Sequence, residues 1–537
     1  MTPRTSVLSV GILALVVVIG HLTLFPKIAD LDGFYHIGHA FAYAEGSMFN
    51  TSMPWATQSI IADQGADLWW GFHVALMPFT LIGNVDWAIR VAAIALTASL
   101  ALCFLWILGR HGVTGAGWWT ALFLIAVPDV FFRHLMLRPH ILSVAASLAL
   151  LSFMTRGRWR LVFMASALIA WLHLGVFWMA PAVAIAYGLV RLGEALFGLK
   201  PGRESVSPSV AISASFLGTV AGWLLRPHPI EAGVLANVQI LRLFAQKATE
   251  APLLFAADLF PMPFLELVST SWFFLTAWLI VAIGTLTYLG RDKLSNIPRE
   301  ERTLLLTTLV ISLAFALIAT LSARGAIEQW VAFGALALPV FWTHVVYVYH
   351  RRSVRRFVLL ALSLHLGWGA WRHSLNVKHA AFEPDTMESA ARFLADNSEP
   401  GQVVFHTRLD NFGPLFAFNR DNLYIGGMDP IFQFVHEPRF YWEYFYVSSD
   451  INVESTCDAF PCSRGNMTDM YTVLRDHFAA RWVVVEPSRN PRFSLYLSND
   501  ERYRLAHESP SEAVFEVVGA LSAAPAFDSI LGPRRIN

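Results

Sequence analysis

Residues 6–39 read SVLSVGILALVVVIGHLTLFPKIADLDGFYHIGH, an apolar run followed at once by an acidic and aromatic segment. The run from Ser6 to Phe25 has about 20 residues and no charged side chain, which is the length that a helix needs to cross a bilayer. A signal peptide has a shorter apolar stretch and a small-residue cleavage site, and this segment has no A-x-A pattern. The stretch therefore predicts a retained membrane-spanning helix.

Similar apolar runs recur up to residue 372 and predict about eleven crossings. They lie near residues 6–25, 87–109, 115–133, 138–154, 159–172, 174–192, 208–226, 268–290, 302–322, 328–349 and 356–372. The chain is 55% hydrophobic and 15% charged, against about 25% charged residues in a soluble domain. The expected fold class is an α-helical polytopic membrane protein, with residues 1–372 as the transmembrane domain and residues 373–537 as a C-terminal extracytoplasmic α/β domain.

Basic residues predict the orientation, because short cytoplasmic loops collect Lys and Arg. Five basic loops alternate with the crossings as a cytoplasmic location requires; they contain Arg110; Arg156, Arg158 and Arg160; Lys200 and Arg203; Arg291, Lys293, Arg299 and Arg302; and Arg351, Arg352, Arg355 and Arg356. With Arg4 and the N-terminus also inside, both ends of residues 27–86 are external. The C-terminal domain is then external too.

Two external segments should lie on the membrane rather than cross it. The apolar stretch 68–83 has both flanks outside, and its Trp69 and Trp70 suit the headgroup level. Asp63, Asp67 and His73 of the same loop are explained equally well as polar anchors of an interface helix or as site residues. The segment 227–267 is too polar to span and predicts amphipathic helices.

The C-terminal residues contain segments with helical spacing and segments with the composition of β-strands. MESAARFLADN has helical spacing, and GQVVFHTRLD, RWVVVEPS and EAVFEVV are strand candidates. Cys457 and Cys462 could form a disulfide in an oxidising compartment, and a zinc site would need more ligands than these two.

The densest polar cluster follows the first helix, in ADLDGFYHIGHA. Asp30 and Asp32, two residues apart outside a membrane, can hold a divalent cation through hard oxygen ligands. One of them can instead act as a general base toward an acceptor hydroxyl or amide. The alternative is that both are solvated loop residues, one of them a helix N-cap.

The second external loop, PDVFFRHLMLRPH, is short and basic. Arg133 and Arg138 could clamp a lipid phosphate, because guanidinium matches phosphate bidentately. Snorkelling toward ordinary headgroups is the alternative. Asp129 is either a further functional carboxylate or a partner of Arg133 one turn away.

The order of these features resembles the GT-C superfamily of glycosyltransferases, which use a polyprenyl-phosphate-linked sugar donor. The segment DLDGFYHIGHA is similar to the start of the first external loop in the catalytic subunit of oligosaccharyltransferases. Asp410 in TRLDNFG is placed like the Asp of that subunit's W-W-D-x-G acceptor motif, although both tryptophans are missing. The candidate residues are, for catalysis, Asp32, Asp30 and His36; for the donor phosphate, Arg133, Arg138 and His140; for the acceptor side, Asp410; and for a divalent cation such as Mg²⁺ or Mn²⁺, Asp30, Asp32 and Asp129.

The expected function is transfer of a sugar from this lipid-linked donor to an acceptor outside a bacterial inner membrane, with membrane lipids and the donor as partners. Lys and Arg balance Asp and Glu at 39 each, so charge gives no indication of nucleic acid. The chain has no phosphate-binding P-loop, G-x-S-x-G elbow or H-E-x-x-H pair, which argues against an ATP-driven pump, a serine lipase and a zincin. A transporter or flippase of lipid-linked substrates, or a non-catalytic GT-C-like envelope scaffold, remains the alternative.

Overall fold

The computed structural model describes residues 3–199, 205–249, 253–290, 294, 297–346 and 352–519. The chain forms two compact units, each built from separate stretches of sequence. The first, here the helical unit, comprises Met1–Ala29, Arg90–Leu225 and Ala257–Ala381. The second, the sheet unit, comprises Asp30–Ile89, Arg226–Ala256 and Phe382–Asn537. The two external loops expected to belong to the transmembrane domain thus group with the C-terminal residues.

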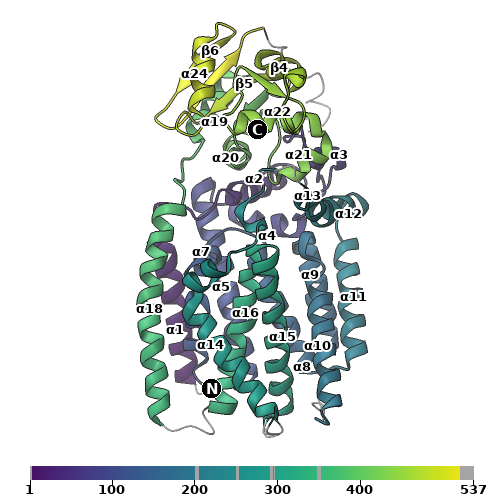
Figure 1. Cartoon of the computed structure of the whole chain (residues 1–537), viewed down its shortest axis with the longest axis vertical. Coiled ribbons are helices and arrows are strands. Elements are labelled where there is room, and N and C mark those ends of the chain that lie inside the picture. The colour runs from purple at the N-terminus through teal and green to yellow at the C-terminus, as the bar shows by residue number, and fades with distance from the viewer. Residues whose placement is uncertain are drawn as a thin grey trace. The chain divides into compact units, whose positions relative to one another are not determined.

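The helical unit is made of helices, most of them long (Figure 1). They are α1 (Pro3–Leu24), α5 (Val85–Arg110), α6 (Ala116–Ile125), α7 (Pro128–His134), α8 (His140–Thr155), α9 (Trp159–Leu172), α10 (Met179–Leu196), α11 (Pro208–Leu224), α14 (Phe264–Gly290), α15 (Arg299–Leu321), α16 (Ile327–Phe341) and α18 (Arg352–Ala380). Within the described part of the chain, five helices are long and apolar enough to cross a membrane, or seven if two bent pairs each count as one span.

One of the bent pairs differs from the straight crossing expected there. The predicted crossing 115–133 consists of α6 and α7, which meet at 97°. Pro128 begins α7, and proline has no amide hydrogen with which to continue the preceding helix. Two other apolar helices, His140–Thr155 and Trp159–Leu172, are shorter than a full span. The basic loop residues Lys200, Arg203, Arg291, Lys293 and Arg351 lie outside the described residues.

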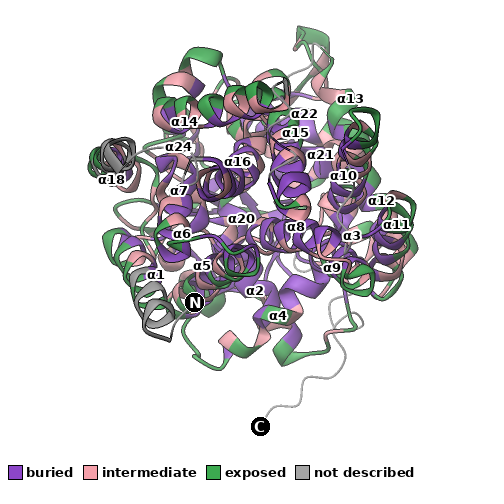
Figure 2. Ribbon diagram, turned by 90° about the horizontal axis from the view of Figure 1, so that it is seen from below, coloured by how far each residue is buried: buried purple, intermediate pink, exposed green. Residues whose placement is uncertain are grey.

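Large apolar side chains cover the outward faces of the helical unit. Figure 2 shows exposed residues along the outer sides of α11 and α14. Among them, Leu217 is 58% exposed, Ile283 62% and Leu286 66%. A soluble protein rarely exposes such continuous apolar surface, whereas a lipid-facing helix requires it. Together with the spans, this surface identifies a multi-pass membrane protein.

Two glycines allow α9 and α11 to pack closely in this unit. A Cβ atom at Gly218 or Gly222 would overlap the carbonyl oxygens of Phe163 and Ala167, respectively. These glycines are four residues apart, the spacing that brings helix backbones together in membranes. At the same interface the Ser166 hydroxyl donates a 3.0 Å hydrogen bond to Ser215 Oγ.

The sheet unit contains a five-stranded mixed sheet in the order β2-β1-β5-β7-β6. β1 pairs in parallel with β2 and β5, while β7 is antiparallel to both β5 and β6. The strands are β1 (Val403–His406), β2 (Leu423–Tyr424), β5 (Ala480–Val485), β6 (Tyr503–Glu508) and β7 (Ala513–Val517), with a separate hairpin of β3 (Ser455–Cys457) and β4 (Met467–Asp469). The three strands expected from sequence are confirmed.

Helices accompany this sheet, and a disulfide closes a short loop between β3 and β4. The helices of the unit include α2 (Asp32–Glu45), α3 (Ile60–Gln64), α4 (Trp70–Thr80), α12 (Pro229–Asn237), α13 (Leu243–Lys247), α19 (Glu388–Asn397), α20 (Phe412–Phe418), α21 (Pro430–His436), α22 (Pro438–Ser448) and α24 (Pro491–Asn499). α19 confirms the helix expected in MESAARFLADN. Cys457 and Cys462 are joined in a disulfide, as expected.

The segment after α1, predicted to be the first external loop, is part of the core of this unit. α2 packs on α20, where a Cβ atom at Gly38 would come within 3.1 Å of Ala417 Cα. Residues after α2 extend the sheet edge: the Tyr424 amide donates to the Trp55 carbonyl at 2.7 Å, and the Thr57 amide donates to the Tyr424 carbonyl at 2.8 Å. The loop is therefore held by backbone hydrogen bonds as well as by apolar packing.

The stretch 68–83 is too short to cross a membrane, as expected, but its tryptophans are buried within the unit. α4 has 11 helical residues, fewer than the roughly 20 that a crossing needs. Trp69 and Trp70, expected at the headgroup level, are only 7% and 6% exposed. The Trp70 indole donates a 2.6 Å hydrogen bond to the Met48 carbonyl, so both rings belong to the interior of the unit.

Candidate functional site

The acidic segment starts α2 and sets the side chains of its buried face. The Asp32 amide donates to Asp30 Oδ1 at 3.1 Å, an arrangement that turns the chain into the helix. Asp30 is 6% exposed and is therefore not a solvated loop residue. Helical spacing then stacks the side chains of Tyr35, His39 and Tyr43 along one buried side of the helix.

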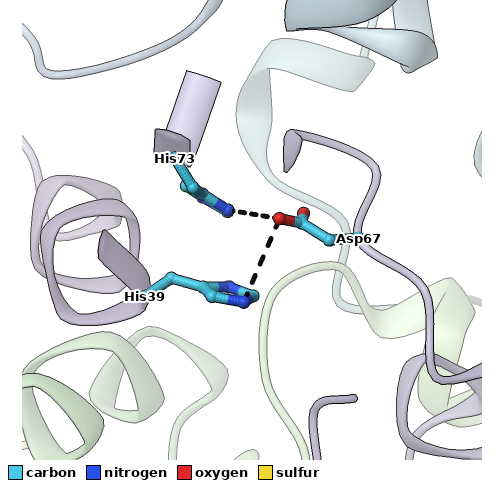
Figure 3. A group of neighbouring side chains, drawn as sticks. All are labelled: His39, Asp67 and His73. Carbon is cyan, nitrogen blue, oxygen red and sulfur yellow. Dashed lines mark hydrogen bonds and ion pairs between the residues drawn. The ribbon is translucent and has the colours of Figure 1, made fainter. Parts of the chain in front are cut away.

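One of these side chains, His39, meets two other buried groups, Asp67 and His73, in the cluster drawn in Figure 3. His73 Nδ1 lies 2.6 Å from Asp67 Oδ2, and His39 Nε2 lies 4.0 Å from the same oxygen. His39 comes from α2, His73 from α4, and Asp67 from the turn between them. We call His39, Asp67 and His73 the histidine–aspartate cluster.

Neighbouring polar groups fix each member of the cluster. The Tyr43 hydroxyl donates to Asp67 Oδ2 at 2.8 Å, and the Trp69 amide donates to Asp67 Oδ1 at 2.8 Å. His73 Nε2 is 2.8 Å from His36 Nδ1. The candidate catalytic residue His36 is thus coupled to a carboxylate through a second imidazole.

Electrostatics keep this cluster in a defined charge state. Burial by itself would raise the pKa of Asp67, but His73 and His39 and the hydrogen bonds to the carboxylate hold that pKa well below its usual range. Burial and the neighbouring His73 lower the pKa of His39 to about 3, despite the opposing effect of Asp67. Asp67 is therefore ionised and His39 neutral at pH 7.

A buried arginine closes the cluster from a third segment. Arg226 is 4% exposed and donates to the carbonyls of Asp67 and Leu68 at 3.1 and 3.3 Å. Burial lowers the pKa of Arg226 to about 10, although Asp67 opposes that shift. The guanidinium thus holds the turn that carries Asp67.

The sequence contained these residues but gave no reason to join them. Asp67 and His73 lie more than 25 residues beyond His39, and helical spacing made them look like anchors of a surface helix. Asp63, taken with them, lies elsewhere: it is 2.6 Å from His436 Nδ1. The packing of α4 against α2 brings Asp67 and His73 to His39, whereas Asp63 pairs with His436.

The candidate phosphate ligands form a second cluster in the helical unit, here called the arginine cluster. Arg133 donates to Asp258 at 2.5 Å and also to Glu328. Arg138 lies 3.6 Å from the same Asp258, and His140 Nε2 lies 3.2 Å from Glu328 Oε2. Both carboxylates were absent from the expected site because they come from distant segments.

The two arginines of this cluster differ in their contacts with carboxylates and in the exposure of their side chains. Burial would raise the pKa of Asp258, but Arg133, Arg138 and His140 together lower that pKa to about 2. Arg133 therefore contacts an ionised Asp258 as well as Glu328, whereas the Arg138 side chain is 25% exposed. Asp129 is not among the partners of Arg133; its Oδ1 accepts a 2.8 Å hydrogen bond from Asn376.

Asp410 lies on a polar cavity of about 690 Å³ in the sheet unit. Leu31, between the two acidic residues Asp30 and Asp32, lines the same cavity. Charged residues of both signs make up half of the remaining lining: Glu383, Asp385, Glu388, Arg392, Arg408, Glu486, Arg489 and Glu512. Such a lining suits a hydrophilic ligand rather than a lipid chain.

The structure does not gather the expected metal ligands into one group. Among the residues that it describes, one set of at least three His, Cys, Asp or Glu side chains is close enough to share an ion, and that set is His39, Asp67 and His73. Asp30 and Asp32 lie outside the set, and Asp129 belongs to the helical unit.

Comparison with known proteins gives a result at the level of the fold. No family model and no curated protein sequence matches the chain. Its structure is similar to ArnT from Cupriavidus metallidurans in the apo state, with a TM-score of 0.56 and 13% identity over 99% of this chain and 100% of that chain. The values are the same for ArnT bound to undecaprenyl phosphate.

The apo oligosaccharyltransferase of Archaeoglobus fulgidus is also similar, with a TM-score of 0.53 and 11% identity over 89% of this chain and 69% of that chain. At such low identities the likeness concerns the fold. It agrees with the resemblance expected from the order of features along the sequence: the chain has the fold of ArnT and of this oligosaccharyltransferase.

Proposed function

We propose that this chain is a GT-C-type glycosyltransferase that moves a sugar from a polyprenyl-phosphate-linked donor to an acceptor outside a bacterial inner membrane. The observation that carries the proposal is the likeness to ArnT over the whole chain, including the form of ArnT bound to undecaprenyl phosphate. The multi-pass helical unit supports a lipid-linked donor, because such a donor remains in the bilayer.

Asp32 is the proposed catalytic residue. It occupies the first turn of α2, where the helix dipole favours the ionised carboxylate that a base or a metal ligand needs. Asp30 accepts a hydrogen bond from the Asp32 amide and so helps to fix the start of α2 that carries Asp32. As a base, its carboxylate would accept the proton of the acceptor nucleophile; as a Mg²⁺ or Mn²⁺ ligand, it would help to orient the donor phosphate.

The Asp32→Asn variant tests this role. We expect transfer to fall by about 10²-fold or more, because an amide neither accepts a proton nor binds Mg²⁺ well. The measurement is sugar transfer from a lipid-linked donor by purified protein, with the thermal midpoint as the control for folding. Unchanged transfer would contradict the catalytic assignment and favour a transporter or a scaffold.

Arg138 and His140 are the proposed phosphate ligands of the arginine cluster, with Arg133 as their support. Arg138→Ala should weaken binding of undecaprenyl phosphate by about tenfold, with little change in thermal midpoint, since its side chain is 25% exposed. Arg133→Ala should instead destabilise the fold by about 3–5 kcal/mol, because it leaves Glu328, 2% exposed, without its arginine. Equal effects of both substitutions on binding alone would contradict this division.

The polar cavity beside Asp410 is the proposed acceptor side. Its mixed charges would recognise a hydrophilic acceptor, and the acidic segment reaches its wall through Leu31. The missing tryptophans of TRLDNFG make an acceptor other than the peptide of an oligosaccharyltransferase the natural expectation.

A further inference from the structure

We propose that His39, Asp67 and His73 bind one transition-metal ion of the zinc class. Two imidazoles and one carboxylate are a ligand set that such ions prefer, whereas Mg²⁺ prefers oxygen ligands alone. This site is distinct from the carboxylates Asp30, Asp32 and Asp129, and the proposal does not depend on glycosyl transfer.

The first observation is an unsatisfied ligand atom. His39 is 1% exposed, and its Nε2 has no hydrogen-bond partner among the described residues. That atom faces Asp67 Oδ2 across 4.0 Å (Figure 3). A buried polar atom without a partner carries a free-energy cost, and a shared ion would remove it.

The second observation is that the outer contacts of a metal site are already present. A histidine that binds a metal normally engages a hydrogen-bond partner through its other ring nitrogen. His39 Nδ1 lies 3.3 Å from the Tyr35 hydroxyl, and His73 Nε2 lies 2.8 Å from His36. Asp67 is oriented in the same way by Tyr43 and by the Trp69 amide.

The third observation concerns spacing. All three ligand atoms lie within 4.8 Å of one another. Two ligands of a tetrahedral zinc ion are about 3.3 Å apart, as follows from metal–ligand distances of about 2.0–2.1 Å. The observed separations of 2.6 and 4.0 Å lie on either side of that value, so a small rotation of the shared carboxylate would equalise them.

An ion here would act on structure. It would link α2, the turn at Asp67 and α4. These segments already meet through the hydrogen bonds of Asp67 with His73 and Tyr43, the contact of His36 with His73, and apolar packing. Its loss should therefore lower the thermal midpoint of the purified protein.

The test uses the full-length protein in detergent, purified without a histidine tag, stripped with a chelator and titrated with Zn²⁺ and Co²⁺. We expect one ion per chain by elemental analysis, a Co²⁺ absorption band typical of low coordination number, and a higher thermal midpoint. Loss of one ligand in His39→Gln should weaken binding by at least about 100-fold, since loss of an outer partner alone costs 10–100-fold.

Two controls separate a true site from other binding. His406→Gln changes another fully buried histidine of the same unit, one held by two backbone carbonyls, and should keep the ion. Asp32→Asn should also keep it, even where transfer is lost, so failure of the metal proposal and failure of the proposed function are distinguishable. Absence of stoichiometric binding by the wild-type protein, or equal binding by His39→Gln, would overturn the proposal.

Discussion

Asp429 shows how one half-buried side chain can make stability depend on pH. Its Oδ1 accepts a 3.2 Å hydrogen bond from the Ile431 amide and caps α21. Burial raises the pKa of Asp429 to about 6, although this hydrogen bond opposes the shift. The folded state therefore prefers the protonated carboxyl, while the unfolded chain ionises near pH 4.

The sign of this effect follows from the raised pKa. Ionisation is easier in the unfolded chain, so stability is lost as the pH rises from about 4 to 6 and stays lower above that. Asp429→Asn keeps the capping oxygen and removes the charge, and should raise the thermal midpoint above pH 6 but not at pH 4. Thermal unfolding of both proteins between pH 4 and pH 8 measures this, and a constant difference across that range would contradict it.

Helix packing decides how much of the helical unit tolerates substitution. α9 and α11 approach so closely that Gly218 and Gly222 have no room for a side chain. The G-x-x-x-G spacing is visible in the sequence, but it identifies a partner helix only once the three-dimensional neighbour is known.

Gly222→Leu should separate α9 from α11 and destabilise the protein by about 1–3 kcal/mol or more, since its side chain would overlap the backbone of Ala167. Gly193→Leu on α10 is the matched control, because a Cβ atom there meets nothing within 4 Å. Thermal midpoints in the same detergent compare the two. A Gly222→Leu protein as stable as the control would refute the close contact.

At the scale of the whole molecule, the sheet unit is assembled from three separate parts of the chain. The Phe34 ring lies 5.4 Å from that of Phe418, and Trp55 lies 5.1 Å from Phe416, so the loop and the C-terminal residues share one apolar core. The C-terminal residues therefore depend on residues that precede them by more than 300 positions.

Residues 382–519 expressed alone should not fold, because they lack α2 and the segment that extends the edge of β2. A fusion of residues 30–89 to 382–519 through a flexible linker should recover part of the stability. Circular dichroism and chemical denaturation compare the unfolding of these two proteins. Cooperative unfolding of residues 382–519 on their own would contradict this account of the core.

Features that depend on neighbouring residues, such as helices and strands, could be predicted from the sequence. Apolar length predicted the helices of a membrane protein, and β-branched runs predicted β1, β5 and β7, because hydropathy and backbone propensity act over neighbouring residues. The order of helix, acidic loop and crossings was sufficient for the GT-C resemblance, which the fold confirms.

Only the tertiary structure decided which distant residues meet. The bend at Pro128, the burial of Trp69 and Trp70, and the pairing of Arg133 with Asp258 and Glu328 all depend on long-range packing. The same holds for the histidine–aspartate cluster, whose members come from three segments. Contacts of this kind arise from mutual burial of surfaces far apart in sequence, and no local pattern contains that information.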